Sequence, residues 1–428
     1  MFGIAKLSSC ERKTFRLHLA YSLIEGVLLG VIALNEFVFV KSLLGSSYQV
    51  SLLFQFSMVV FIFLVFFNEI LKRIKNKRKL LRKTAIITRL PLLLLFFFPH
   101  SADQLGGDSI YHFIFLAIFM VYYMAHPIIF PIINQLLKTN YSHNNFGKLY
   151  SYATMINKVV MMVTIFAYGY ILDLNNFAFV YIFPVAGVLG IISVLLLSNI
   201  PVKIDEEAAE EKEKPRLMVS VKNSAKEMWN ILVTNVPFRH FQAGFMLYGL
   251  GFMGSVIVIV LFFEYGLGLN YASIAFYKNG YNIIAIAIMP LFGKLIGKID
   301  PRRFAAISFL AMASYLLFLI LTEIFPANIE FLGITLYYMM IFYILFHSVF
   351  AATMGLLWSI GSAYFCKPSE AGTYQSIHLA LTGMRALFAP LMGVFFYEMW
   401  GFRITFIIAI SFLLIGSSLM LWSEKRFK

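Results

Sequence analysis

Apolar residues occur along the chain in long runs, and short polar connectors separate these runs. A membrane-spanning α-helix needs about 20 mostly apolar residues to cross about 30 Å of hydrocarbon. The third run is the shortest and contains Pro91, which removes a backbone donor from a helix. The pattern predicts an all-α polytopic membrane protein, and the twelve segments that fit a span are 17–40, 48–68, 84–99, 110–136, 148–172, 177–199, 238–263, 271–293, 304–324, 331–357, 373–397 and 403–422.

Basic residues mark every second connector between these runs. Most of the 35 Lys and Arg residues lie in or beside alternate connectors, and the intervening connectors contain none. Lys41 and Arg403 only mark the ends of spans that face those intervening connectors. Positive residues are retained on the cytoplasmic side during insertion. We therefore expect a multi-pass protein of a cell membrane, here a bacterial cytoplasmic membrane, with both termini in the cytoplasm.

Composition supports the membrane assignment and narrows the class of function. Hydrophobic residues make up 60% of the chain and charged residues 13%, with a mean hydropathy of +0.81, which excludes an ordinary soluble domain. The net charge of +14 follows from the topology, so we expect no nucleic-acid partner. Cys10 and Cys366 both map to the cytoplasmic side, so neither a disulfide framework nor a metal site is expected. We expect no cofactor.

The longest connector divides the chain into two halves. Its dense charge at 201–216 cannot bury a core and should stay solvated. Apolar residues then recur at helical spacing, which predicts an amphipathic helix on the inner membrane surface, with a partner-docking helix as the alternative. We expect an N-terminal six-helix bundle at 1–199, a cytoplasmic linker at 200–235 and a C-terminal six-helix bundle at 236–428.

The two halves also resemble each other in sequence. One constant shift superimposes Gly147 on Gly372 and Asp173 on Glu398, and it keeps the fifth and eleventh spans in register. Paired halves of this kind are typical of transporter folds, in which the substrate site lies between the repeats near the membrane midplane.

The connector after the eighth span combines a glycine with a group of basic residues. It reads Gly293-Lys-Leu-Ile-Gly-Lys-Ile-Asp-Pro-Arg-Arg303 and resembles the Gly-x-Leu-x-Asp-Arg-x-Gly-Arg-Arg loop of the major facilitator superfamily. Gly297 stands where the family has Asp, and Asp300 where it has Gly. The resemblance implies a two-bundle transporter that works by alternating access, with this loop acting in the conformational change. The residues that fit the pattern are Gly293, Leu295, Lys298, Arg302 and Arg303.

Two basic residues occur near the middle of corresponding spans. At 1.5 Å per residue, Lys158 lies about 15 Å into the fifth span and Arg385 about 18 Å into the eleventh. A charge inside the bilayer is costly and usually faces a cavity or a partner. His378 and Thr382 share a helical stripe with Arg385, and Thr154 shares one with Lys158.

Lys278 and Asn282 likewise share one face of the eighth span. The family resemblance places the first, fifth, eighth and eleventh spans around a central cavity. A basic site for an anionic or strongly polar solute is the functional interpretation. The alternative is a set of interhelical ion pairs and hydrogen bonds that holds the bundles together. The candidate substrate-binding residues are Lys158, Arg385, Lys278, Asn282, Thr382, His378 and Thr154.

Glu25 is the acidic candidate, about 12 Å from the cytoplasmic end of the first span. A carboxyl group that alternates between a basic partner and a proton can couple transport to a proton gradient. The alternative is a permanent ion pair of Glu25 with Lys158 or Arg385. Arg89 is near the inner end of the third span, so we expect it to snorkel to the interface.

The leading hypothesis is secondary active transport of a small polar, anionic solute, with protons as the candidate coupling ion. A lipid translocator or a non-transporting sensor with the same fold is the first alternative. A polytopic membrane enzyme is the second, although no hydrolase, phosphate-loop or paired metal-ligand motif is present in the sequence. We therefore do not expect an enzyme. The expected partners are the solute, protons and membrane lipids, and we expect a monomer to be functional.

Overall fold

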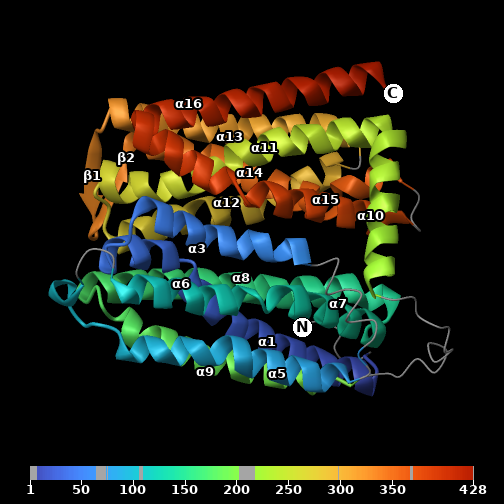
Figure 1. Cartoon of the computed structure of the whole chain (residues 1–428), viewed down its shortest axis with the longest axis horizontal. Helices are drawn as coiled ribbons and strands as arrows, with labels where there is room; N and C mark the ends of the chain where they lie inside the picture. Colours follow the sequence, from blue (N-terminus) through green and yellow to red (C-terminus); the bar gives the residue numbers. More distant parts are fainter. Residues whose placement is uncertain are drawn as a thin grey trace. The chain divides into compact units, whose positions relative to one another are not determined.

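The computed structural model describes residues 7–63, 74, 76–105, 109–201, 217–296, 298–366 and 370–427. Helices dominate this part of the chain (Figure 1). The chain divides into two compact units. Unit 1 comprises Met1–Leu44 and Phe63–Lys222, and unit 2 comprises Gly45–Ile62 and Asn223–Lys428.

Unit 1 is entirely helical in its described residues. The first predicted span consists of a long helix, a turn at Ala33 and Leu34, a short helix and a π-helix, and the fourth is interrupted just before His126. The elements are α1 (Ser9–Ile32), α2 (Asn35–Phe37), a π-helix (Val38–Ser42), α5 (Lys77–Arg89), 3₁₀ helices (Leu90–Phe97 and Ala102–Gln104), α6 (Ile110–Tyr123), α7 (His126–Asn140), α8 (His143–Leu174) and α9 (Phe179–Ser198).

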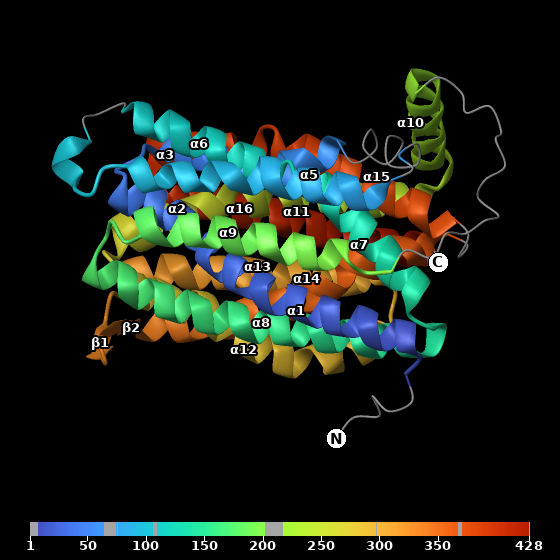
Figure 2. The same ribbon diagram turned by 90° about the horizontal axis from the view of Figure 1, so that it is seen from below.

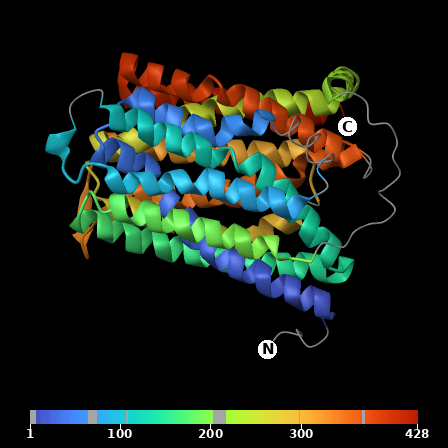
Figure 3. The same ribbon diagram turned by 60° about the horizontal axis from the view of Figure 1, so that its bottom comes forward.

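Small residues let α1 approach its neighbours closely. α1 packs against α8 and α9, as Figure 2 shows. A Cβ atom at Gly26 would lie 2.7 Å from the backbone oxygen of Asn157 on α8. Gly30, one turn later, faces the same helix. Glycines spaced four residues apart are a common means of bringing two membrane helices into contact. α5 and the 3₁₀ helix that follows it pack along α9, and Figure 3 shows α5 (light blue) beside α9 (green).

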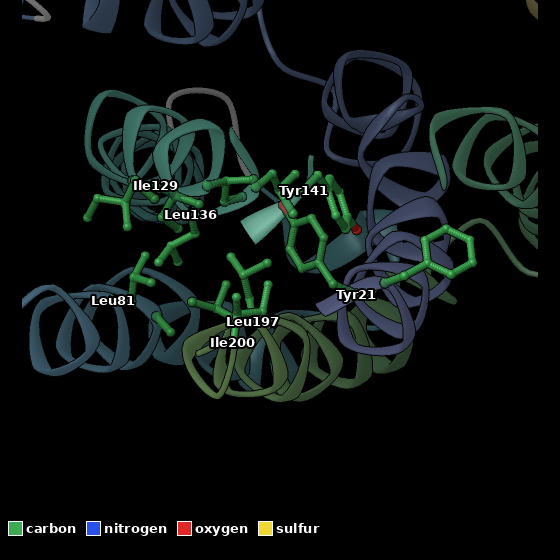
Figure 4. Close-up of a cluster of buried hydrophobic side chains, with 14 of the residues drawn as sticks. Tyr21, Leu81, Ile129, Leu136, Tyr141, Leu197 and Ile200 are labelled. Carbon is green, nitrogen blue, oxygen red and sulfur yellow. The ribbon is translucent and has the colours of Figure 1, made fainter. Parts of the chain in front are cut away.

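One end of unit 1 is closed by an apolar cluster and a carboxylate. Tyr21, Leu81, Leu136 and Leu197 belong to this buried cluster (Figure 4). At the same end, Glu11 of α1 accepts hydrogen bonds from residues at the start of α8 and from the backbone N–H of Ser8. Its partners at the start of α8 are Ser142 N (3.0 Å), Ser142 Oγ (2.8 Å) and Asn145 Nδ2 (3.0 Å). A carboxylate at a helix N-terminus accepts hydrogen bonds from free N–H groups and interacts favourably with the positive end of the helix dipole.

Unit 2 contains the second predicted span together with the C-terminal half of the chain. α3 packs against α11, α15 and α16. The side-chain amide of Gln55 on α3 donates to the backbone oxygen of Leu387. The expected domain division at 200–235 remains a prediction. By its contacts, α3 is part of unit 2. The elements are α3 (Ser47–Val59), a 3₁₀ helix (Val60–Phe63), α11 (Val236–Leu261), a π-helix (Phe262–Gly266), α12 (Tyr271–Ile296), α13 (Pro301–Ile324), β1 (Asn328–Phe331), β2 (Ile334–Tyr337), α14 (Tyr338–Ile360), a 3₁₀ helix (Gly361–Phe365), α15 (Ala371–Ala386) and α16 (Ala389–Arg426).

A glycine divides α16 into two helical runs. Gly401 has φ 76° and ψ −177°, a conformation that side chains disfavour. The runs before and after it correspond to the end of the eleventh predicted span and to the twelfth. Both runs pack with α11 or α13 in unit 2 (Figure 1).

The structure differs from the expected boundaries of the third and tenth spans for reasons of backbone chemistry. The third span was expected from residue 84, but α5 begins at Lys77 because Asn76 Oδ1 caps it by accepting from Lys79 N at 2.9 Å. Pro91 then converts the remainder into a 3₁₀ helix. The tenth span was expected from residue 331, but β1 and β2 form an antiparallel hairpin there. Leu332 (φ 51°) and Gly333 (φ 73°) make its two-residue turn.

The helical architecture agrees with a membrane protein. Among the described residues, nine helical stretches are long and apolar enough to cross a membrane. The predicted helix after the charged connector is also present, as α10 (Leu217–Thr234), and Trp229 on it is exposed. The charged stretch 202–216 lies outside the described residues.

Candidate functional site

The side chain of Glu25 is directed into unit 1 from the middle of α1. It is 7% exposed, and its Oε2 accepts a hydrogen bond from Ser193 Oγ of α9 at 3.1 Å. The same hydroxyl lies 2.9 Å from the backbone oxygen of Gly190. A single hydroxyl therefore links the carboxylate to the backbone of α9.

The prediction that Arg89 snorkels to the interface is wrong. Its side chain is 2% exposed and lies inside unit 1. Nη1 donates to Thr88 Oγ1 at 3.0 Å, and the guanidinium lies over the Tyr122 ring, 4.6 Å from the centroid. Gly190 leaves room for it, since a Cβ there would lie 2.9 Å from Arg89 Cγ. An aromatic face and a missing side chain thus hold the cation inside, and Arg89 interacts electrostatically with Glu25.

Lys158 and Thr154 lie one turn apart on α8, and both are half-buried. The orientation of α8 is fixed by Asn157, whose Nδ2 donates to the backbone oxygen of Ser22 on α1 at 2.9 Å. Within the described part of the chain, Lys158 forms no hydrogen bond or ion pair.

Arg385 is buried inside unit 2, between α15 and α11. It is 2% exposed and donates from Nη1 to the backbone oxygen of Phe245. Its guanidinium lies 5.5 Å from the centroid of the Tyr248 ring. A Cβ at Gly249 would overlap the guanidinium, so this glycine provides the space that Arg385 fills. The arrangement ties α15 to α11.

His378 and Thr382 are buried on the same helix as Arg385. Thr382 Oγ1 donates to the backbone oxygen of His378 at 2.9 Å. His378 Nδ1 lies 3.1 Å from Oε1 of Gln242 on α11. The predicted stripe on α15 is therefore real, but its polar groups meet α11 within unit 2.

Lys278 and Asn282 are half-buried on α12. Asn282 Nδ2 donates to the backbone oxygen of Lys278 at 2.7 Å. The neighbouring Tyr281 stacks on His347 of α14 with ring centroids 3.6 Å apart. Tyr315 of α13 covers the other face of that imidazole at 4.5 Å. Two tyrosine rings therefore stack against the imidazole of His347.

The basic connector after α12 is bound to the end of α16. Arg302 donates to both carboxylate oxygens of Asp300, from Nε at 2.9 Å and from Nη2 at 2.7 Å. It also donates to the backbone oxygens of Ser423 and Phe427, each at 2.8 Å. Arg303 pairs with Glu424 at 3.0 Å. This half of the predicted conformational loop braces unit 2.

The contacts of Arg302 favour the charged form of Asp300. Partial burial alone would raise the pKa of its carboxyl group. The hydrogen bonds and charge of Arg302 outweigh that effect, so the pKa lies below its ordinary value of 3.8. Lys298 is exposed, and Gly293 has no atom within 4 Å of the place where a Cβ would stand.

The sequence profile of the Major Facilitator Superfamily matches residues 18–354. The chain belongs to the major facilitator superfamily. Among proteins of curated function, none is similar enough in sequence to count as a match. The family and the fold are those of multi-pass membrane transporters rather than enzymes.

Solved structures of facilitator transporters share this fold at low sequence identity. A variant of the nucleoside transporter NupG has a TM-score of 0.71 and 11% identity, with 98% of this chain and 100% of that chain covered. The xylose transporter XylE from E. coli, partially occluded and inward open, has a TM-score of 0.63 and 13% identity, with 98% of each chain covered. A bacterial homologue of the human lysosomal transporter Spinster has a TM-score of 0.64 and 13% identity, with 98% of each chain covered.

Three features of this facilitator protein could not be identified from the sequence. Arg89 is internal, Gln242 is the partner of His378, and Tyr281 stacks on His347. Gln242 and His378 are 136 residues apart, so no local spacing connects them. For Arg89, the one available signal was the cost of a cation within a predicted span.

Proposed function

We propose that the protein is a secondary active transporter that moves a small polar solute bearing a negative charge by alternating access. Membership of the facilitator superfamily supports solute transport. The half-buried Lys158, which has no hydrogen-bonding or ionic partner among the described residues, supports the negative charge. This lysine is the observation on which the proposal rests.

Lys158 belongs to a membrane helix, where the cost of burying a charge must be offset by an interaction. A lysine at the bilayer centre costs about 2.5–3.5 kcal/mol on insertion scales. An ion pair could offset that cost, but Lys158 forms none with the described residues. Hydration, or a carboxylate or phosphate of the solute, can offset it instead. Thr154, one turn away, would add a hydroxyl to the same contact.

Arg385, Thr382 and His378 remain candidates for the solute site, together with Lys278 and Asn282. Arg385 is bonded to the backbone oxygen of Phe245 and packs on Gly249. A direct contact with the solute would require its guanidinium to leave that carbonyl. We therefore propose Lys158 as the primary anion ligand.

We further propose Glu25 as the proton-coupling residue. Its carboxylate has one hydrogen-bonding hydroxyl, from Ser193, and one cation, Arg89, that interacts with it inside unit 1. A carboxyl group in such surroundings can exchange a proton for a charge interaction during the cycle. The pairing with Lys158 or Arg385 considered from sequence is not needed for this role.

Uptake into proteoliposomes tests the proposal. The purified full chain would be screened with radiolabelled small carboxylates and phosphates and with neutral compounds of the same size, with and without a pH gradient. We expect anions to be transported, and Lys158→Gln to lower their uptake by roughly ten- to a hundredfold. Lys226→Gln on α10, an exposed lysine, is the matched control.

Two outcomes would contradict specific parts of the proposal. Uptake of anions that is unchanged in Lys158→Gln would remove the anion site from α8. Binding without uptake, or flip-flop of labelled lipids without solute uptake, would favour the sensor or the lipid translocator.

A further inference from the structure

Gln242 and His378 form a polar pair inside unit 2. Gln242 is 3% exposed on α11 and His378 is 2% exposed on α15. Gln242 Oε1 and His378 Nδ1 lie 3.1 Å apart. Gln242 Nε2 and His378 Nε2 are both buried and have no hydrogen-bond partner among the described residues. Each side chain therefore has one polar atom that bonds to the other side chain and a second polar atom without a hydrogen bond.

The unused atoms have a defined hydrogen-bonding character. His378 forms no hydrogen bond with a described carboxylate, and a buried ring without a counter-charge is a neutral imidazole. If Nδ1–H donates to Gln242 Oε1, the ring leaves Nε2 as an acceptor and the amide leaves an N–H donor. If the amide is turned over, the ring leaves an Nε2–H donor and the amide leaves an oxygen acceptor. In both cases the pair offers one donor and one acceptor.

Aromatic rings hold this pair in place. Trp358 meets the His378 ring edge to face at 4.9 Å, and Phe245 meets it at 4.7 Å with an interplanar angle of 83°. A buried donor or acceptor without a partner costs about 1–3 kcal/mol. Two such atoms on one hydrogen-bonded pair of side chains indicate a partner that is present during part of the transport cycle.

We propose that Gln242 and His378 form a hydrogen-bonding subsite for a neutral group of the transported solute that has both a donor and an acceptor, such as a carboxamide. The inference rests on the proposed transport function and narrows its solute class. The solute then carries a negative charge and, separately, a neutral amide-like group. A second carboxylate at this subsite would meet an acceptor and be rejected, because it has no proton to donate.

Trp358 provides a direct measurement. In a Trp229→Phe/Trp400→Phe/Trp422→Phe chain, Trp358 is the one remaining tryptophan. Its fluorescence would be titrated in the full-length protein with malonamate, succinamate and glutaramate. The matched dianions malonate, succinate and glutarate would be titrated in parallel. We expect at least one amide to bind about tenfold more tightly than its dianion.

Variants separate recognition from folding. Gln242→Leu should remove the preference for the amide by weakening amide binding about tenfold. Gln242→Asn keeps a carboxamide and should retain part of the preference. Thermal unfolding of each variant reports whether the fold persists. Leu261, an apolar residue near the other end of α11, gives the matched control Leu261→Val, which should leave the amide preference unchanged.

The outcomes distinguish this subsite from the anion site. Weaker binding of both an amide and its matched dianion in Lys158→Gln reports the anion site. The ratio of amide affinity to dianion affinity reports the Gln242–His378 subsite. Equal binding of amide and dianion, no amide binding at any of the three lengths, or an unchanged ratio in Gln242→Leu would overturn the subsite. Uptake of other anions in the proteoliposome screen would still support the transport function in those cases.

Discussion

The guanidinium of Arg89 lies over the ring of Tyr122, 4.6 Å from its centroid, in the interior of unit 1. Glu25 is the buried carboxylate that interacts with this cation. Removal of one charge from a buried pair leaves the other uncompensated. Arg89→Leu and Glu25→Gln should each lower the free energy of unfolding by roughly 3 kcal/mol, and the double variant by less than the sum.

Thermal unfolding in detergent measures this coupling, with Lys83→Leu as the control because Lys83 is exposed on the same helix as Arg89. Strictly additive effects would show that Arg89 and Glu25 are stabilised independently. Arg89 would then owe its position to Tyr122 and Gly190 alone.

Gly249 should not tolerate a methyl group. The added Cβ in Gly249→Ala would overlap the Arg385 guanidinium. Overpacking of this kind costs about 1–3 kcal/mol. Gly254→Ala on the same helix is the matched control, since its nearest contact would be an ordinary 3.5 Å. Thermal unfolding followed by circular dichroism should give a lower melting temperature for Gly249→Ala and little change for Gly254→Ala. Equal melting temperatures would mean that Arg385 can vacate the space at little cost.

Asp300 should make the stability of unit 2 depend on pH in the acidic range. Its pKa in the folded protein is lower than the ordinary value of 3.8. The carboxylate therefore contributes stability that is complete above that ordinary value and is lost as pH falls through the folded-state pKa. Asp300→Asn should reduce the loss of melting temperature between about pH 5 and pH 3. Lys294→Gln, an exposed site on α12, should keep the parent's profile. An unchanged slope in Asp300→Asn would assign the acid sensitivity to other carboxylates.

Glu11 should stabilise unit 1 by joining the starts of α1 and α8. Four hydrogen bonds reach its carboxylate, three of them from Ser142 and Asn145. Glu11→Ala should lower the free energy of unfolding by about 2 kcal/mol. Arg12→Ala, at the exposed neighbouring position, should change it little. Hydrogen exchange at the first turn of α8 gives a local readout. Protection that persists in Glu11→Ala would show that Ser142 caps α8 without help.

Topology gives an independent prediction from the charge pattern. In a chain without Cys10 and Cys366, Ser101→Cys should react with an impermeant maleimide added outside intact cells. Ser224→Cys, on α10, should react only after the membrane is opened. The Cys-free chain measures background. Labelling of both cysteines from outside would contradict the cytoplasmic position of the long connector.

The sequence predicted helices well where hydrophobicity alone decides them. The predicted span 271–293 corresponds to Tyr271–Ile296, and 304–324 to Pro301–Ile324. It failed where backbone chemistry decides. The predicted span began at Phe331 because β2 is apolar, but the left-handed turn at Leu332 and Gly333 makes this segment part of a hairpin. Asn76 likewise begins α5 earlier than its hydrophobicity suggests.

Candidate site residues could be named from the sequence where a charge is costly within an apolar span. A charge within an apolar run is conspicuous, so Glu25, Lys158 and Arg385 could be singled out. The partners of these charges were not predictable, because Ser193 and Phe245 are ordinary residues far along the chain from Glu25 and Arg385. Arg89 was misplaced because snorkelling and burial give the same sequence pattern. The Tyr122 face that decides between them is visible only in three dimensions.

The β1–β2 hairpin is attached to α12 through Tyr277 and through Ser273, whose Oγ accepts from the backbone N–H of Thr335 at 2.9 Å. Tyr277 Oη donates to the backbone oxygen of Thr335 and accepts from the backbone N–H of Tyr337, both at 2.9 Å. At the tip, Leu332 is 76% exposed, and the backbone oxygen of Gly333 accepts a hydrogen bond from Asn270 Nδ2 at 2.8 Å. A small rigid protein spliced between Leu332 and Gly333 would thus inherit a fixed orientation. Such a fusion would serve as an alignment marker for imaging the protein.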